Sequence, residues 1–202
     1  NLSKAGFDAE RARRAMARRS RFLGWGPTLH IFVVTLRCNE TCVYCHASRA
    51  PVDAFHTDMP VETAERAVAL ALSTTSPSVT IEFQGGEPLL NFPVLKRIVE
   101  HAIEQNRALN KRLEFTLVTN LAAMDDEKLA WLIDHRIQIC TSVDGPPDLH
   151  DRQRRLPGGS AFERAAHWIR RINEAYVSMG LDPSVYRVEA LLTTTRETLP
   201  LW

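Results

Sequence analysis

The sequence predicts an α/β fold in which the strands form one parallel sheet. From Leu29 onward, short apolar and β-branched runs alternate with segments of helical periodicity. Strand followed by helix, repeated in order, implies parallel strands joined by right-handed crossovers. Such a sheet is either open and doubly wound or a full or partial (β/α) barrel. Both arrangements place their chemistry at the carboxyl ends of the strands.

Five strands and four helices are expected in this alternation. The first strand, Leu29–Leu36, is nearly continuous apolar, so we expect it to be buried on both faces. Pro60 is placed to start the first of the helices. The other expected strands are 79–83, 113–119, 137–143 and 185–193, and the helices are 60–73, 91–109, 125–134 and 160–179.

A basic segment precedes this alternation. Residues 8–22 read as a helix with few apolar positions and many arginines, and a Gly24, Gly26 and Pro27 break follows. We therefore interpret residues 1–27 as an N-terminal helical extension and 28–202 as the core. The arginines could contact an acidic peptide, although a solvated helical face is the favoured interpretation.

Composition excludes several classes of protein. The 202 residues are 45% hydrophobic and 24% charged, with a net charge of +1, as in ordinary globular domains. The near-neutral charge predicts no nucleic-acid or membrane partner. Neither a signal peptide nor an apolar run of the ~20 residues that cross a bilayer is evident. Three clustered thiols favour a reducing, cytoplasmic location.

The distinctive residues fall at the predicted strand ends. The cysteines follow the first strand, Gly85-Gly86-Glu87 the second, Asn120 the third, and Ser142 and Asp144 the fourth. Because parallel strands end at one edge of a sheet, these residues should lie together. This coincidence predicts an active site.

The cysteines Cys38, Cys42 and Cys45 have the spacing C-x3-C-x2-C. Thiolates are the natural ligands of iron–sulfur clusters, and three on one loop can hold three irons of a cubane and leave the fourth open. Zinc with His46 or His56 as a further ligand is an alternative, as is a buried structural triad. Spacing alone favours the cluster. Cys140 is interpreted as a small buried hydrophobe.

Taken together, these motifs resemble the radical S-adenosylmethionine (SAM) superfamily. The resemblance rests on the cysteine motif with Tyr44 before its last cysteine, on GGEP from Gly85, and on SVDGP from Ser142, with HDxxR from His150 following. It covers roughly residues 29–195. The order of motifs is typical of the peptide- and protein-modifying branch, which includes the SPASM-type anaerobic sulfatase maturases. The run TLRCNETCVYCHASR is similar to the maturases of the His-Xaa-Ser system.

The resemblance implies a partial parallel (β/α) barrel with a [4Fe–4S] cluster held by the three cysteines. It implies SAM as second cofactor, reductive cleavage to a 5′-deoxyadenosyl radical, a peptide or small-protein substrate, and an electron donor such as flavodoxin or ferredoxin. Glu87 would pair with the SAM ammonium, and Asn120 would contact the SAM carboxylate. The remaining implied SAM-binding residues are Tyr44, Gly85, Gly86, Ser142, Asp144, Arg154 and Leu192. Each residue also has a simpler interpretation: the strand-end residues could form turns or helix caps, Arg154 could be a surface arginine, and Leu192 could be a core leucine.

Two other functions stay open at this point. One is a radical-SAM enzyme that modifies a small molecule or RNA, and the other is a zinc-stabilised binding module without redox chemistry. Members of the branch usually continue into a sixth strand and a C-terminal domain with further cysteines, whereas no cysteine follows Cys140. We therefore expect a core truncated after about five strands, with an uncovered edge at residues 185–193 and no turnover on its own.

Overall fold

The computed structural model describes residues 8–199, and its centre is a five-stranded parallel sheet in the order β1-β3-β4-β5-β7. Every neighbouring pair in this order is parallel. Because chain order and spatial order agree, the predicted partial (β/α) barrel is confirmed. The strands are β1 Leu29–Thr35, β3 Ser78–Gly85, β4 Arg112–Val118, β5 Gln138–Ser142 and β7 Glu189–Leu191.

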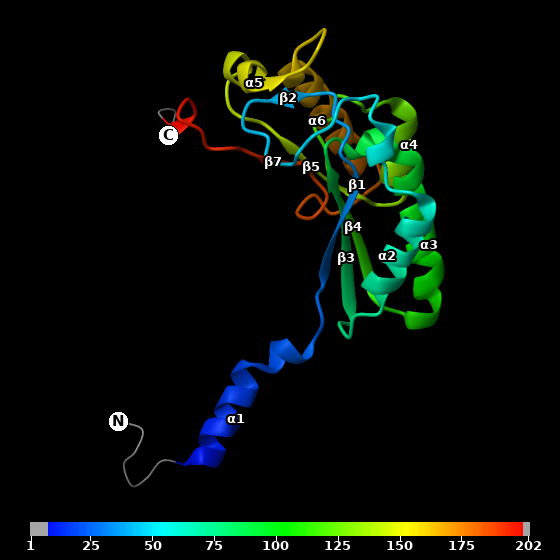
Figure 1. The fold of residues 1–202 in the computed structure, drawn as a ribbon, viewed down its shortest axis with the longest axis vertical. Coiled ribbons are helices and arrows are strands. Elements are labelled where there is room, and N and C mark those ends of the chain that lie inside the picture. Colours follow the sequence, from blue (N-terminus) through cyan, green and yellow to red (C-terminus); the bar gives the residue numbers. More distant parts are fainter. Residues whose placement is uncertain (1–7, 200–202) are drawn as a thin grey trace.

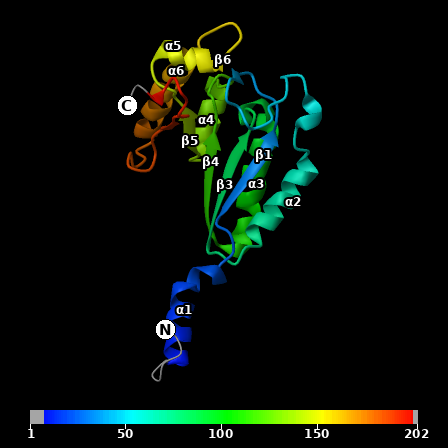
Figure 2. The same cartoon turned by 60° about the vertical axis from the view of Figure 1, so that its left-hand side comes forward.

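Four helices form the outer layer. Helices α2 and α3 lie side by side along one face of the sheet, and α4 and α6 continue this layer (Figures 1 and 2). Two of them begin at side-chain caps, because Asp125 accepts a hydrogen bond from the Lys128 N–H at 2.8 Å and Ser160 one from the Glu163 N–H at 3.0 Å. Their bounds are α2 Val61–Leu72, α3 Phe92–Leu109, α4 Asp126–Asp134 and α6 Ala161–Ser178.

The hydrophobic core fills the space between the sheet and these helices. Ile81 and Phe83 of β3 pack there with Leu95 of α3, and all three are fully buried. Tyr176 of α6 is also buried, and its hydroxyl donates to the Ile137 carbonyl at 2.6 Å. The one polar atom of that side chain is therefore satisfied within the core.

The opposite face of the sheet is open, which corrects one expectation. In β1, Phe32 and Val34 are buried, but Leu29, Ile31 and Val33 are 48%, 52% and 45% exposed. The prediction that this strand is buried on both faces is wrong. A continuous apolar run does not distinguish a strand covered on both sides from one whose second face lines an incompletely closed barrel.

The open face becomes polar beyond β1. It carries a cavity of about 390 Å³, lined by Glu82, Gln84 and Cys140 among others. Cys140 is thus half-buried at this cavity and is not a small core hydrophobe. Burial raises the pKa of its thiol to about 11, and Glu189 and Glu82 add to the effect.

The last strand is shorter than expected. Strand β7 spans Glu189–Leu191, whereas residues 185–193 were predicted. A turn precedes it, in which the Tyr186 N–H donates to the Asp182 carbonyl at 2.7 Å. All three β7 residues are exposed, and the strand pairs with β5 at the end of the sheet order.

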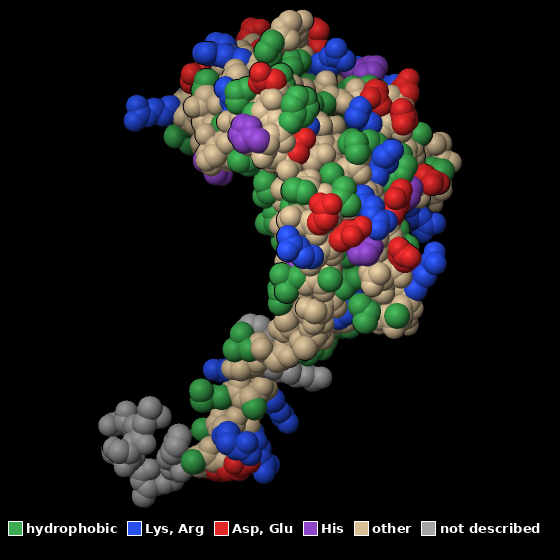
Figure 3. All heavy atoms as spheres, turned by 45° about the vertical axis from the view of Figure 1, so that its right-hand side comes forward, with side chains coloured by type: hydrophobic (Ala, Val, Ile, Leu, Met, Phe, Trp, Pro, Cys, Tyr) green, Lys and Arg blue, Asp and Glu red, His purple; other side chains and the backbone are tan. Residues whose placement is uncertain are grey.

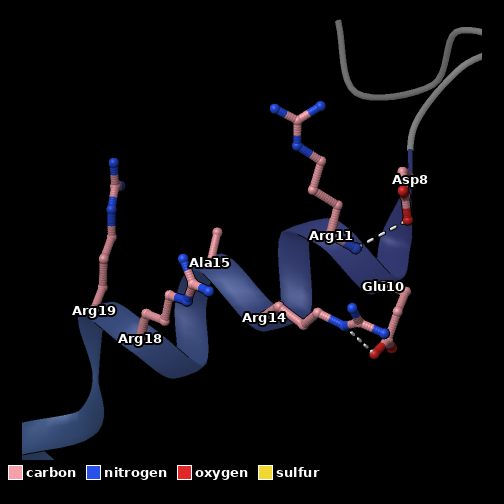
Figure 4. Close-up of a pocket in the computed structure, with 7 residues that line it drawn as sticks. All are labelled: Asp8, Glu10, Arg11, Arg14, Ala15, Arg18 and Arg19. Carbon is pink, nitrogen blue, oxygen red and sulfur yellow. Dashed lines mark hydrogen bonds and ion pairs between the residues drawn. The ribbon is translucent and has the colours of Figure 1, made fainter.

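The basic N-terminal segment forms helix α1 (Ala9–Arg19) and a 3₁₀ turn, η1 (Arg21–Gly24). Figure 1 shows α1 projecting beyond the sheet, Figure 3 shows a narrow extension leaving the main body of the molecule, and none of the α1 residues is buried. A hollow of about 620 Å³ beside it is lined entirely by residues 8–19 (Figure 4). A groove on one helix has no opposing wall, so it does not enclose a ligand. The boundary at residue 27 remains an interpretation.

Within residues 8–199, none of the helices combines the length and the apolar character that crossing a membrane requires.

A pair of leucines tests where the core lies. Leu95→Ala should lower the free energy of unfolding by about 2–5 kcal/mol, because Leu95 is fully buried and the substitution leaves a cavity. Leu70→Ala is the matched control, since Leu70 is 74% exposed, and it should change stability by no more than about 0.5 kcal/mol. Urea unfolding measures both values. Equal losses would show that α3 does not pack on the sheet as described.

Candidate active site at the carboxyl ends of the strands

The three cysteines lie on a loop that leaves β1 and returns to the same point. The Ala50 N–H donates to the Leu36 carbonyl at 2.6 Å, and the Cys38 N–H donates to the Ala50 carbonyl at 3.1 Å. The loop is therefore closed at its base, as in a compact Ω-loop. We refer to residues 37–50 as the cysteine loop.

An ion pair between buried Arg37 and half-buried Asp58 fixes the base of this loop. Arg37 donates from Nε and Nη2 to the two carboxylate oxygens of Asp58, both at 2.8 Å, and from Nη2 to the Leu90 carbonyl at 2.6 Å. Its guanidinium also lies 4.5 Å from the centre of the Phe55 ring. Burial acts to raise the pKa of Asp58, but hydrogen bonds from Arg37 and Thr35 hold it below its usual value.

The far side of the cysteine loop is joined to a segment much later in the chain. Strand β2 (Thr41–Cys42) pairs antiparallel with β6 (Arg154–Arg155), so that Cys42 lies opposite Arg154. Helix α5 (Pro147–Gln153) leads into β6, and the Val43 N–H donates to the Gln153 carbonyl at 2.9 Å. Figure 1 shows this ribbon at the end of the sheet away from α1.

Gly85 and Gly86 lie directly against the base of the loop. A Cβ at Gly86 would be 2.4 Å from the Leu36 carbonyl oxygen and 2.3 Å from that of Arg37. Gly85 has φ +144°, and a Cβ there would be 2.1 Å from the Thr35 carbonyl oxygen. Here the missing side chains permit contact between two segments of backbone. Both glycines also line the cavity described below.

Glu87 is fully buried and its carboxylate is saturated by the protein. It accepts hydrogen bonds from the Thr119 hydroxyl at 2.7 Å, the Asn120 N–H at 2.8 Å and the Leu89 N–H at 3.0 Å. Burial nevertheless raises its pKa. Glu87 thus ties the end of β3 to the end of β4. That it contacts SAM stays a prediction, and in this structure its side chain does not line the cavity.

Asn120 connects the end of β4 to the cysteine loop. Its amide nitrogen donates to Asn39 Oδ1 at 2.8 Å and lies 3.8 Å from Cys38 Sγ. Its oxygen accepts from the Ala122 N–H at 2.9 Å. The Asn120 side chain therefore stabilises the turn after β4 and at the same time holds the cysteine loop.

Three of the predicted residues bind one another. Asp144, fully buried, accepts hydrogen bonds from the Tyr44 hydroxyl, from Arg154 Nε at 2.9 Å and from the Thr193 N–H at 3.1 Å. The Arg154 guanidinium also lies 5.3 Å from the Tyr44 ring centre and 3.9 Å from Cys42 Sγ. Burial, together with the bond to Asp144, raises the pKa of Tyr44.

These elements surround a cavity of about 250 Å³. All three cysteines line this cavity, so they lie together at one end of the sheet, as predicted. That they bind a cluster stays a prediction. Glu87, Asp144 and Leu192 do not line it, and Leu192 is only half-buried. Of the predicted residues, the lining includes Cys38, Cys42, Cys45, Tyr44, Gly85, Gly86, Asn120, Ser142 and Arg154.

Several lining residues escaped the sequence reasoning, among them Glu40, Gln84 and Thr193. Glu40 could have been recognised from the sequence, because it is an acidic residue within the cysteine motif itself. Burial raises the pKa of Glu40 to about 7, while Arg154 opposes the shift. Thr193 had no such signal, because its place depends on where the short β7 ends.

None of the three loop cysteines forms a disulfide, and burial disfavours the charged forms of Cys38 and Cys42. Burial raises the pKa of Cys38 to about 11 and that of Cys42 to about 12. No three His, Cys, Asp or Glu side chains in residues 8–199 already converge on a point as ligands of a metal ion. The cysteines therefore line the cavity without being drawn together.

The fold and this cavity define a class of protein. Residues 32–185 match the Radical SAM superfamily, and because this match covers more than half of the sequence, the chain belongs to that superfamily. The superfamily assignment made from the motifs is thereby confirmed.

Its relatives place it more closely. A segment of 143 residues is 27% identical to a cysteine-type anaerobic sulfatase-maturating enzyme of Clostridium perfringens and covers 66% of this chain and 38% of that one. A segment of 116 residues is 34% identical to an uncharacterized protein of Methanocaldococcus jannaschii, with 57% and 38% coverage. A radical SAM cyclopropyl synthase of Paramaledivibacter caminithermalis is 24% identical over 131 residues, with 58% and 27% coverage. The sulfatase-maturating enzyme and the cyclopropyl synthase support the peptide-modifying branch.

Solved structures agree on the fold. Native anSMEcpe with bound AdoMet superposes with a TM-score of 0.68 at 23% identity, over 85% of this chain and 45% of that one. The same score is obtained for its complex with AdoMet and the Cp18Cys peptide. The chain thus spans less than half the length of each of these relatives.

Membership of the superfamily implies a [4Fe–4S] cluster and SAM as cofactors, and the donor set fits them. Three unpaired thiols on one closed loop border one cavity, and a cluster of several irons needs ligands that are spread more widely than those of a single ion. The remaining walls carry the polar side chains of Arg154 and Asn120 and the backbone of Gly85 and Gly86, which suit a polar ligand such as SAM.

The contact at Gly86 gives a test of how the loop base is built. Gly86→Ala should lower the free energy of unfolding by about 1–3 kcal/mol, because the added methyl group overlaps two carbonyl oxygens. Gly159→Ala is the control, since a Cβ there meets nothing within 4 Å. Chemical denaturation compares the two. A Gly86→Ala chain as stable as the control would disprove the close approach.

The Arg37–Asp58 pair predicts a pH dependence. A carboxyl group whose pKa is depressed on folding contributes stability above its unfolded pKa of about 3.9 and loses that contribution as the pH falls through the folded value. Asp58→Asn should therefore lower the free energy of unfolding by about 1.5–3 kcal/mol at pH 7. Below about pH 4 the free energies of unfolding of the variant and the unmodified chain should converge.

Unfolding curves measured across this pH range check the prediction. Asp53→Asn serves as control, because Asp53 is exposed and accepts no side-chain hydrogen bond among the described residues. A difference between Asp58→Asn and the unmodified chain that stays constant down to pH 3 would contradict the assigned role.

Proposed function

We propose that the chain is the catalytic core of a radical-SAM enzyme that modifies a peptide or protein. The observation that carries this proposal is the shared cavity. Cys38, Cys42 and Cys45 border it together with Gly85–Gly86 and Arg154, at the carboxyl ends of a parallel sheet. Membership of the superfamily gives this arrangement its chemical meaning.

In this proposal the three thiolates hold the cluster, and the other walls hold SAM. When bound and reduced, a [4Fe–4S] cluster supplies the electron that cleaves SAM to methionine and a 5′-deoxyadenosyl radical. Arg154 offers a guanidinium to the SAM carboxylate, and its bond to Asp144 fixes the direction of that donor. Ser142 and Asn120 offer hydrogen bonds on the neighbouring strand ends.

Glu87 and Asp144 support these walls from behind, and Tyr44 is itself part of the wall and is bonded to Asp144. Glu87 joins two strand ends, and Asp144 joins Tyr44, Arg154 and Thr193. Their role is to hold the cavity in shape, because pre-organised donors lose little freedom when a ligand binds. Direct contact of these three side chains with SAM remains a prediction from the resemblance.

The open face of the sheet favours a large substrate. Its cavity shares the lining residues Gln84 and Val118 with the cysteine-lined cavity, so the two cavities adjoin. Because no helix among residues 8–199 covers this face, an extended chain can reach the site from the side. The proposal therefore assigns a peptide substrate and an external donor such as flavodoxin or ferredoxin. The likeness to the His-Xaa-Ser maturases stays a prediction.

Anaerobic reconstitution tests the proposal. The chain should take up iron and sulfide, turn brown, and release 5′-deoxyadenosine from SAM after reduction with dithionite. Replacement of any of the three loop cysteines by Ala should abolish both the visible absorbance and the cleavage, because each thiolate is a ligand.

Cys140→Ala is the matched control, because Cys140 lies on the open face away from the cysteine loop, and it should retain both properties. A colourless chain that binds zinc through the same cysteines would instead establish the zinc-stabilised module. Cleavage of SAM that persists in all three loop variants would reject the assigned ligands.

A further inference from the structure

Helix α1 concentrates the positive charge of the chain. Residues 8–19 contain five arginines against Asp8 and Glu10, a net charge of +3, whereas the net charge of the whole chain is +1. All other residues together are therefore net negative. Positive charge gathered on one short helix creates a local field that attracts a partner of opposite sign, which the near-neutral total conceals.

Most of this charge is not neutralised by the protein. Glu10 forms ion pairs with Arg13 and Arg14, at 2.7 Å and 2.9 Å. The other three arginines of the helix are exposed and take part in none of the ion pairs among residues 8–199. They are Arg11, Arg18 and Arg19.

The free guanidinium groups border the hollow beside α1. Arg11 and Arg18 are seven residues apart, so they lie on one face, about 10 Å from each other along the helix axis. Figure 4 shows Ala15 between them, and its short side chain leaves the hollow of about 620 Å³ open. Two carboxylates also line it, but Glu10 is ion-paired and Asp8 caps the helix through the Arg11 N–H at 2.9 Å. This face therefore fits a chain whose carboxylates are about 10 Å apart.

The helix gains no stability from packing on the rest of the protein. It is 11 residues long, and none of them is buried. Helices of that length are marginal in water when they stand alone. A bound partner would supply the contacts that the described part of the chain does not.

Two kinds of anionic partner fit this surface poorly. A membrane-binding helix needs bulky apolar residues opposite its charges, but Met16 is the largest apolar side chain of α1 and the rest are alanines. A nucleic acid would extend along the net negative remainder of the chain, which repels phosphate. An acidic polypeptide segment has neither difficulty.

The position of α1 indicates which acidic polypeptide gains from binding there. Figure 1 shows α1 and the cysteine loop at opposite ends of the sheet. An electron donor has to approach the cluster closely, so docking on α1 would not serve it. A substrate chain can contact both places. The exposed apolar residues Leu29, Ile31 and Val33 of β1 lie along the way from one to the other.

We propose that α1 docks an acidic segment of the peptide or protein substrate, remote from the residue that is modified. This inference rests on the proposed function for the identity of the partner. It adds a feature of the substrate class, namely carboxylates that bind the face formed by Arg11, Ala15 and Arg18.

Fluorescence anisotropy of labelled peptides tests the docking. The probe has about twelve residues with glutamate at every third position, which spaces its carboxylates about 10 Å apart in an extended chain. It should bind the chain at least about tenfold more tightly than the same peptide with glutamine, at about 20 mM NaCl. About 200 mM NaCl should remove most of this difference, because exposed charges are screened. Arg11→Gln combined with Arg18→Gln should weaken binding of the glutamate peptide about tenfold.

A second double variant is the matched control. Arg107→Gln combined with Arg170→Gln removes the same charge from exposed helical positions on α3 and α6, and it should change the affinity less than about twofold. Far-UV circular dichroism checks that each variant keeps its helices. Charge reversal, Arg11→Glu combined with Arg18→Glu, should abolish binding of the glutamate peptide and create binding of its lysine counterpart.

Three results would overturn the inference. They are equal affinities for the glutamate and glutamine peptides, equal losses in the two glutamine double variants, and tighter binding of a short DNA duplex or of phosphatidylserine vesicles than of the glutamate peptide. None of these measurements needs the cluster, so they are independent of the test of the proposed function. If the docking is found but the reconstituted chain does not cleave SAM, the proposed function fails, and with it the identification of the acidic partner as the substrate.

Discussion

Direct contact between two backbones positions this site. Gly85 and Gly86, at the end of β3, lie against the carbonyl oxygens of Thr35, Leu36 and Arg37, where the chain leaves β1. The Gly86 N–H donates to the Thr35 carbonyl at 2.9 Å and the Glu87 N–H to the Arg37 carbonyl at 2.7 Å. Pairing of β1 with β3 therefore extends into the base of the cysteine loop. Any side chain at these positions would separate the loop from the sheet.

Buried charges secure the loop on its other sides. Arg37 binds Asp58 and the Leu90 carbonyl, Glu87 joins β3 to β4, and Asp144 joins Arg154 to Tyr44. Each of these groups joins segments that are remote in sequence, and each is compensated by donors or by an opposite charge. Such networks rigidify a site when every member is satisfied. Glu40 lies on the cavity side of the loop, where its carboxylate accepts a hydrogen bond from Cys42 Sγ at 3.7 Å.

The parallel sheet and the gathering of motifs at one edge followed from sequence pattern, because strand–helix alternation constrains topology strongly. What the pattern missed has physical reasons. The two-residue strands β2 and β6 are too short to show a period, and the open face of β1 is as apolar as its covered face. The bonding of Asp144 to Arg154 and Tyr44 depends on tertiary distances, so residues expected to face a ligand turned out to hold one another. The place of Glu40 in the cavity wall likewise depends on how the cysteine loop folds back, which no local pattern encodes.

The β2–β6 ribbon has a consequence for the order of folding. It brings together Cys42 and Arg154, which are separated by 112 positions. Contacts between positions so distant form late, because the chain between them must first be ordered. Strands β3, β4 and β5 lie within that interval and can pair through contacts that are more local. During synthesis the thiols would therefore emerge and remain accessible well before their cavity exists, and a cluster inserted at that stage would lack the wall formed by Arg154. Insertion into a finished sheet is the order of events that the topology favours.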